Sequence, residues 1–146
     1  MWKCQWSCVG WCPSRSIVSR LRSGEAVLVF PAGGLELDPA LSRVAALASL
    51  ATWSRSIELL ARLTRETLVV PAAVRGVVSR SAFDHPLAKR RAVLKERQRM
   101  ATLLQVALPG YQTSRVSVRF GAPIAGASRD VHAAVIDAMR ALIGAA

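Results

Sequence analysis

The sequence predicts an α/β fold in which helices flank a layered, mostly parallel sheet. Short apolar segments alternate with longer amphipathic ones, and the two clearest apolar segments, 26–30 and 68–70, carry no charge and are each followed by a proline. Strands of parallel sheets have such continuous apolar runs because helices cover both of their faces. The chain has 146 residues, 52% of them hydrophobic, so we expect one globular domain rather than a disordered chain.

The first expected elements are the end of a helix, a strand and a tight loop. Apolar residues within 17–21 predict the last turns of a helix that stops at Ser23-Gly24. Segment 26–30 is partly β-branched and predicts a strand buried on both faces. The loop Pro31-Ala32-Gly33-Gly34 follows, and its two glycines allow backbone N–H groups to approach a ligand closely. An ordinary strand-to-helix turn that needs a positive φ explains the same glycines.

The longest expected helix runs from Asp38 to about Leu63. Asp38 suits the N-cap, and Pro39 suits the first helical position. Glu58 and Arg62 are spaced to form an ion pair on its outer face. Its apolar face consists of Leu50, Trp53, Ile57 and Leu60.

Two strands and two helices are expected in the second half of the chain. Pro71 lacks a ladder donor, so a strand over 68–74 must end there or lie at an edge. A basic helix over 87–108 ends at Pro109-Gly110. Segment 116–120 alternates between apolar and polar residues, as a half-exposed strand does. Ser128 or Asp130 caps the last helix, whose inward residues are Val135, Ile136, Met139, Leu142 and Ile143.

The formal net charge of +11 indicates an anionic partner, although a genome rich in Arg codons explains the same composition. An acidic membrane surface is favoured over nucleic acid, because aromatic residues make up only 5% and none lies within the basic run 89–99. No apolar run approaches the 18 or so residues that a spanning helix needs, and the N-terminus has no apolar signal core. We therefore expect a cytoplasmic protein that is peripheral to the membrane.

Residues 1–16 differ in composition from the rest of the chain, because they contain three of its four tryptophans. We interpret them as a non-native start and residues 17–146 as the domain. Cys4, Cys8 and Cys12 have the spacing of soft-metal ligands on one helix face, but a fourth ligand is missing. Gly10 and Pro13 also interrupt a helix there, so we predict no metal site.

Four sequence blocks, in order over 17–146, resemble the phospholipid and glycerol-phosphate acyltransferase family. Phe30-Pro31-Ala32-Gly33-Gly34 is similar to the family block Phe-Pro-Glu-Gly-Thr-Arg, and Val70-Pro71 is similar to its strand that ends in Val-Pro. Gly76, Ser79 and Phe83 match a Gly-x-x-Ser-x-x-x-Phe run. Segment 118–124 resembles the closing strand and its Gly-x-Pro-Ile turn.

The resemblance implies acyl transfer from acyl-CoA or acyl carrier protein to a lysophospholipid or glycerol-phosphate acceptor, with no other cofactor. Arg75 and Arg80 flank the loop at the expected carboxyl end of the sheet, where α/β proteins bind ligands, although solvated loop charge explains them equally. The predicted substrate-binding residues are Phe30, Pro31, Gly33, Gly34, Pro71, Arg75 and Arg80.

Two departures from the family affect the expected activity. Ala32, Gly34 and Leu35 replace the family's Glu, Thr and Arg. The family's His-x-x-x-x-Asp motif precedes its Phe-Pro block by a strand-helix-strand segment, whereas 29 residues precede Phe30 here and none is His. We therefore predict a domain that is truncated at its N-terminus and inactive by itself, so no catalytic residue is assigned. The alternative is a non-catalytic basic module that binds anionic lipid or nucleic acid.

A literal His-x-x-x-x-Asp occurs at His132 and Asp137, in the last expected helix. Five residues of helix separate two side chains by about 140° around its axis. A general base must contact the carboxylate that orients it, so this pair is not expected to be catalytic.

Overall fold

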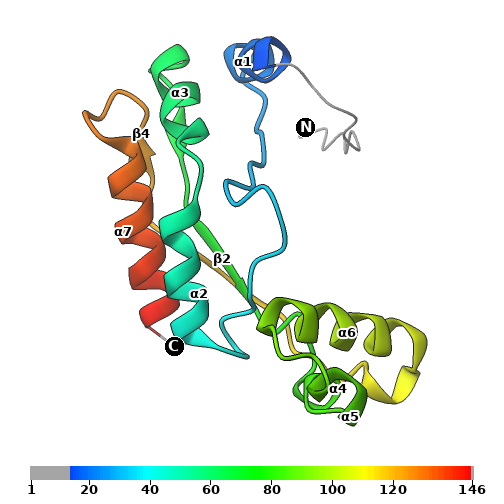
Figure 1. The fold of residues 1–146 in the computed structure, drawn as a ribbon. Coiled ribbons are helices and arrows are strands. Elements are labelled where there is room, and N and C mark those ends of the chain that lie inside the picture. Colours follow the sequence, from blue (N-terminus) through cyan, green and yellow to red (C-terminus); the bar gives the residue numbers. More distant parts are fainter. Residues whose placement is uncertain (1–13, 146) are drawn as a thin grey trace.

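The computed structural model describes residues 14–145 as a mixed α/β structure (Figure 1). Helix α1 (Ser14–Arg22) ends as predicted at Ser23-Gly24, where Gly24 has a φ of 80° and its N–H donates to the carbonyl of Leu21. The predictions for residues 1–13, including Cys4, Cys8 and Cys12, lie outside the described residues. The elements in order are α1 (Ser14–Arg22), α2 (Arg43–Ser49), η1 (Leu50–Thr52), α3 (Ser56–Leu63), β1 (Leu68–Val69), β2 (Ala72–Arg75), α4 (Arg80–Phe83), α5 (Pro86–Lys89), α6 (Leu94–Ala107), η2 (Pro109–Tyr111), β3 (Ser117–Phe120), β4 (Ile124–Ala125) and α7 (Val131–Gly144).

The described strands pair antiparallel, in two sheets of two strands each. β1 pairs with β4, and β2 pairs with β3 with Val74 opposite Val118. The prediction that the strand ends at Pro71 is confirmed, since Pro71 separates β1 from β2 and its carbonyl accepts from the N–H of Gly121 at 2.8 Å. The prediction of a layered, mostly parallel sheet is wrong for residues 14–145, because none of their strand pairs is parallel.

The predicted strand over 26–30 is also wrong. These residues lie in no helix or strand and have no strand partner among the described residues. Leu28 and Phe30 are 67% and 74% exposed, respectively. An apolar run indicates a buried strand only where neighbouring strands and helices cover it, and no described strand pairs with this segment.

Both long predicted helices are interrupted. The first begins at Arg43, where the Ser42 hydroxyl caps it, and it is broken at Trp53 before α3. Asp38 does not cap this helix because its carboxylate accepts from a distant loop, and the Trp53 indole N–H donates to Glu36. The second divides into α5 and α6 around residues 90–93.

Two hydrophobic cores stabilise the part of the chain that the structure describes. The body consists of α2, α3, α7 and the strands beside them, and α7 provides most of its core. The prediction for α7 is confirmed, since Asp130 caps it and its inward residues are buried or packed against the core. The lobe consists of α4, α5, α6 and η2, with a core of Val78, Ala82, Phe83, Ala88 and Ala101. Figure 1 shows the lobe extending from one end of β2, away from α2 and α7.

Only one face of the β2–β3 pair is covered by the described residues. Ala73 lies in the body core with α7, while Val74 and Val118 point away from it and are 45% and 48% exposed. Phe120 is 71% exposed. All four residues of β3 are exposed, so the expected half-exposed strand buries neither face.

Candidate anion-binding region

The loop over 30–34 is a tight turn on the surface. Gly33 has a φ of 62°, and its N–H donates to the carbonyl of Phe30 at 3.2 Å. The turn therefore accounts for Gly33. Gly34 has no positive φ, and a Cβ there would meet no described atom within 4 Å. The carbonyl of Pro31 accepts from the N–H of Ser54 at 3.1 Å, which anchors the loop to the start of α3.

Asp38 forms a clamp between the segment after this loop and the segment after β2. Its carboxylate is buried and accepts from the N–H groups of Gly76, Val77 and Val78 at 2.9, 2.7 and 3.1 Å. Gly76 suits this position because it has a φ of 73° and any Cβ would lie 2.2 Å from the carbonyl oxygen of Arg115. We call these contacts the Asp38 clamp.

Two glutamines on α6 hold the clamp in place. Gln98 is buried, accepts from the N–H of Asp38 and donates to the carbonyl of Glu36, both at 2.8 Å. Gln105 accepts from the N–H of Ser79 at 2.7 Å and donates to the carbonyl of Val77 at 3.0 Å. Every one of these bonds pairs a side chain with the backbone of a distant segment, so the lobe fixes both flanks of the clamp.

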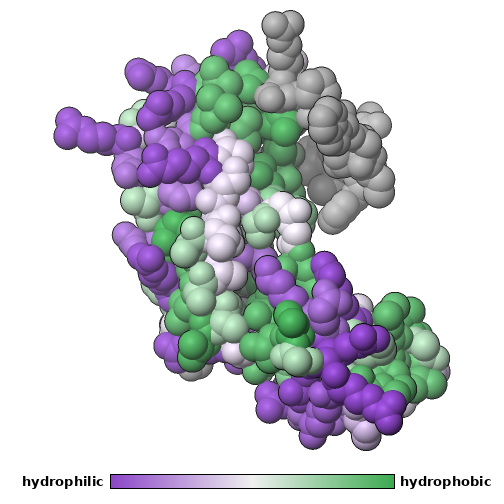
Figure 2. Space-filling model, in the orientation of Figure 1, coloured by the Kyte–Doolittle hydropathy of each residue, from purple (hydrophilic) through white to green (hydrophobic). Residues whose placement is uncertain are grey.

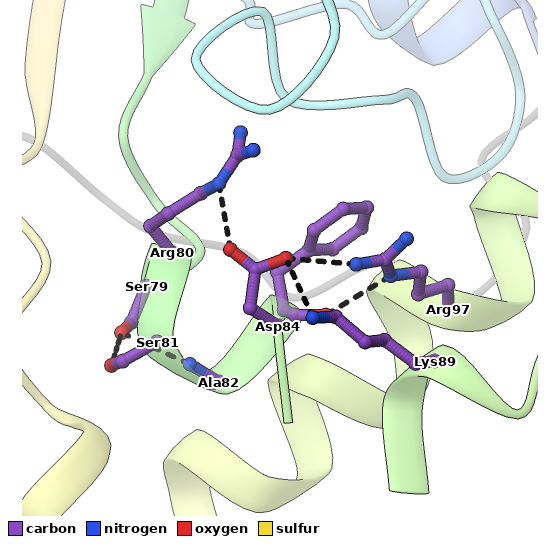
Figure 3. Close-up of polar contacts among 8 residues, drawn as sticks. Ser79, Arg80, Ser81, Ala82, Asp84, Lys89 and Arg97 are labelled. Carbon is purple, nitrogen blue, oxygen red and sulfur yellow. Dashed lines mark hydrogen bonds and ion pairs between the residues drawn. The ribbon is translucent and has the colours of Figure 1, made fainter. Parts of the chain in front are cut away.

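Arg80 belongs to a cluster of three cations around one carboxylate (Figure 3). Asp84 contacts Arg80 and Arg97 at 2.9 Å each and Lys89 at 4.0 Å, which leaves a local charge of +2. Arg97 also lies 4.1 Å from the centre of the Phe83 ring, so it belongs to the packing of the lobe. Arg80 reaches Asp84 through Nε, and its terminal nitrogens point away from that carboxylate.

Arg75 lies at the end of β2, opposite Ser117. It is half-buried and forms no ion pair with another described residue. Arg119 on the neighbouring strand donates instead to the carbonyl of Ala145, at the end of α7. Arg75 ends β2 and Arg80 begins α4, on either side of the clamped loop of residues 76–79, and the parallel sheet whose carboxyl end was expected to hold them is not found among the described strands. No hydrogen bond among the described residues joins either arginine to the loop over 30–34.

Neither histidine is paired with a carboxylate within the described residues. Nδ1 of His85 accepts from the N–H of Leu87 at 3.2 Å and caps α5, and its ring meets the Tyr111 ring edge-on. Nδ1 of His132 is buried without a partner, while Asp137 pairs with Arg140 at 2.9 Å. His132 and Asp137 therefore form no base–carboxylate pair, as the helix geometry predicted.

Two hollows of the described surface lie elsewhere. One, of about 690 Å³, lies between residues 21–25 and the segment that follows α3. The other, of about 310 Å³, lies at the start of α7. None of the predicted substrate-binding residues lines either hollow. Over residues 14–145, no helix is long and apolar enough to cross a membrane, and no group of His, Cys, Asp or Glu side chains has the arrangement of a metal site.

Sequence reasoning missed the residues that organise this region. Asp38 was expected to cap a helix. Glu36 accepts from the Ser49 hydroxyl at 3.2 Å and from the Trp53 indole. The only local signal was glycine at position 76, which indicates a special backbone but not its partner.

Comparison of the chain with models of protein families, with curated proteins and with solved structures finds no match. The resemblance to acyltransferases therefore remains a prediction from the sequence blocks.

Proposed function

We propose that this chain binds the phosphate of a lysophospholipid-type acceptor, as a domain related to the glycerolipid acyltransferases, and that it transfers no acyl group by itself. The Asp38 clamp is the observation that carries the proposal. It connects the chain shortly after Phe30–Gly34, the block that resembles the family's substrate block, to the loop between Arg75 and Arg80.

The two arginines at the ends of the clamped loop, residues 76–79, have side chains suited to binding a phosphate. The terminal nitrogens of Arg80 extend beyond its contact with Asp84, and Arg75 lies at the other end of the loop. A guanidinium binds phosphate through two parallel hydrogen bonds and stays charged at any physiological pH. The backbone around the loop is fixed by Asp38 and Gln105, so less ordering is required when a ligand binds.

Acyl transfer needs a base that removes the proton of the acceptor hydroxyl. His85 uses Nδ1 to cap α5, and His132 has no orienting carboxylate among the described residues. We therefore expect no turnover of acyl-CoA with a lysophospholipid. Turnover that disappears in His85→Ala or His132→Ala would contradict this part of the proposal.

Binding is tested with monomeric short-chain lysophosphatidic acid, by calorimetry below its micelle concentration. Arg75→Gln and Arg80→Gln should each weaken binding about ten-fold, since a charge-assisted hydrogen bond contributes roughly 1.5–3 kcal/mol. Arg65→Gln and Arg129→Gln are matched controls, because both side chains are exposed and lie at the other end of the body. Equal losses in all four variants would mean that net charge, and not this loop, binds the phosphate.

A further inference from the structure

Most of the charge excess is concentrated in one part of the chain. Residues 75–99 contain eight basic and two acidic residues, a net charge of +6 out of +11. Within them, residues 89–96 are exposed without interruption; they comprise the end of α5, the connection over 90–93 and the start of α6. We call residues 87–95 the tip of the lobe. Figure 2 shows hydrophilic and hydrophobic groups side by side on the lobe.

The cations of the tip are available for an external partner. Lys89 is 4.0 Å from Asp84, the longest contact of that cluster. Arg90, Arg91 and Lys95 form no ion pair with another described residue. Four cations therefore lie within seven consecutive positions, 89–95, and no carboxylate is found among those positions.

Aliphatic side chains lie among these cations. Leu87, Val93 and Leu94 are 46%, 61% and 39% exposed, respectively. Val93 occupies the N-cap position of α6, where its side chain makes no hydrogen bond. The lobe core, formed by Val78, Ala82, Phe83, Ala88 and Ala101, does not include any of the three. The fold thus leaves these three side chains partly exposed, between and beside the tip cations in the sequence.

We propose that the tip docks onto an anionic bilayer, with Val93 and its aliphatic neighbours entering the boundary between headgroups and acyl chains. Charge complementarity identifies the occupant: lysine and arginine side chains bind lipid phosphates while aliphatic groups between them leave water. Nucleic acid fits less well, because residues 86–108 contain no aromatic side chain on which a base would stack. The tip does not include Arg75 or Arg80, so this inference is independent of phosphate binding at the clamped loop.

The experiment measures co-sedimentation of the protein with phosphatidylcholine vesicles that contain or lack phosphatidylserine, both without lysolipid. Arg90→Gln combined with Arg91→Gln should lower the partition coefficient on anionic vesicles about twenty-five-fold, since each basic residue near the surface contributes about five-fold. Val93→Ser should lower it roughly three- to ten-fold through the lost burial of an aliphatic side chain. Both losses should shrink on neutral vesicles, where little protein binds.

Matched controls separate the tip from the rest of the surface. Arg65→Gln with Arg129→Gln removes the same charge elsewhere, and Val44→Ser removes a valine that is 81% exposed on α2. Val106→Ser removes a valine of α6 itself, which is 74% exposed but distant in sequence from the tip cations. These three variants should bind vesicles nearly as well as the unaltered protein. Losses equal to those of the tip variants would overturn the proposal, as would preferential binding of a duplex oligonucleotide over anionic vesicles.

Discussion

The body and the lobe are held together by different kinds of interaction. In the body, α7 contributes Val131, Val135, Ile136, Met139 and Ile143 to the core, so burial of large aliphatic side chains stabilises it. Three of the five buried core residues of the lobe are alanines, and its position depends on side chains that bond to distant backbone groups. A core of small residues leaves little apolar area to compensate for a lost polar contact. We therefore expect the lobe to be sensitive to polar substitutions and the body to apolar ones.

The largest expected effect is that of Asp38→Ala. This change removes the acceptor of four backbone N–H groups, those of Ala40, Gly76, Val77 and Val78, and each donor left unsatisfied inside the protein costs about 1–3 kcal/mol. The free energy of unfolding, measured in urea, should fall by about 4 kcal/mol in total. Asp137→Ala is the control, since this carboxylate is exposed and pairs with Arg140 alone among the described residues, and it should change stability by less than about 0.5 kcal/mol. Similar values for the two variants would show that the clamp contributes nothing.

The next-largest expected effect is the difference between methionine-to-alanine substitutions in the body core and beside the lobe core. Met139 is buried in the body core, whereas Met100 is only partly buried against the lobe core. Met139→Ala should destabilise the protein by about 3 kcal/mol, within the range for buried methionine. Met100→Ala should cost about 1 kcal/mol, because less apolar area returns to water. A larger loss for Met100 than for Met139 in thermal unfolding would reverse this comparison of the two cores.

The sequence was sufficient to predict the body helix and insufficient to predict the lobe. The apolar residues of α7 recur with the helical period, and Asp130 lies just before them, so its inward face and its cap were both predictable. The partners of Asp38 and Gln98 are separated by 38–40 and 60–62 residues along the chain. No local pattern identifies such a partner, which is why Asp38 was interpreted as a helix cap.

In the candidate anion-binding region too, local features were predictable and contacts between distant segments were not. Pro71 was predictable as the end of a strand, because proline lacks a ladder donor whatever surrounds it. The direction in which the strands pair was not predictable, because the apolar run at 68–70 and the alternating segment at 116–120 fit parallel and antiparallel partners alike. Arg75 and Arg80 were expected at the carboxyl end of a parallel sheet, whereas the described strands pair antiparallel. The engagement of Arg80 by Asp84 depends on a short helix, α4, that the sequence did not predict.

The smallest expected effect is a gain in stability from Val93→Ser. Helix α6 has no side-chain cap at Val93, and Glu96 occupies the third helical position, so serine would complete a capping box. The free energy of unfolding should rise by about 1 kcal/mol, the typical value of such a cap. Val44→Ser should give no gain, because Ser42 already caps α2 by accepting from the N–H of Ala45.

Calorimetric melting of both variants measures this difference, and a lower melting temperature for Val93→Ser would show that Val93 packs more tightly than its 61% exposure indicates. The result also bears on the bilayer. A variant that is more stable than the unaltered chain and yet binds anionic vesicles less well cannot owe that loss to unfolding. Serine at position 93 would then favour stability, and valine would favour membrane binding. Membrane binding would explain why an exposed valine occupies the uncapped start of α6.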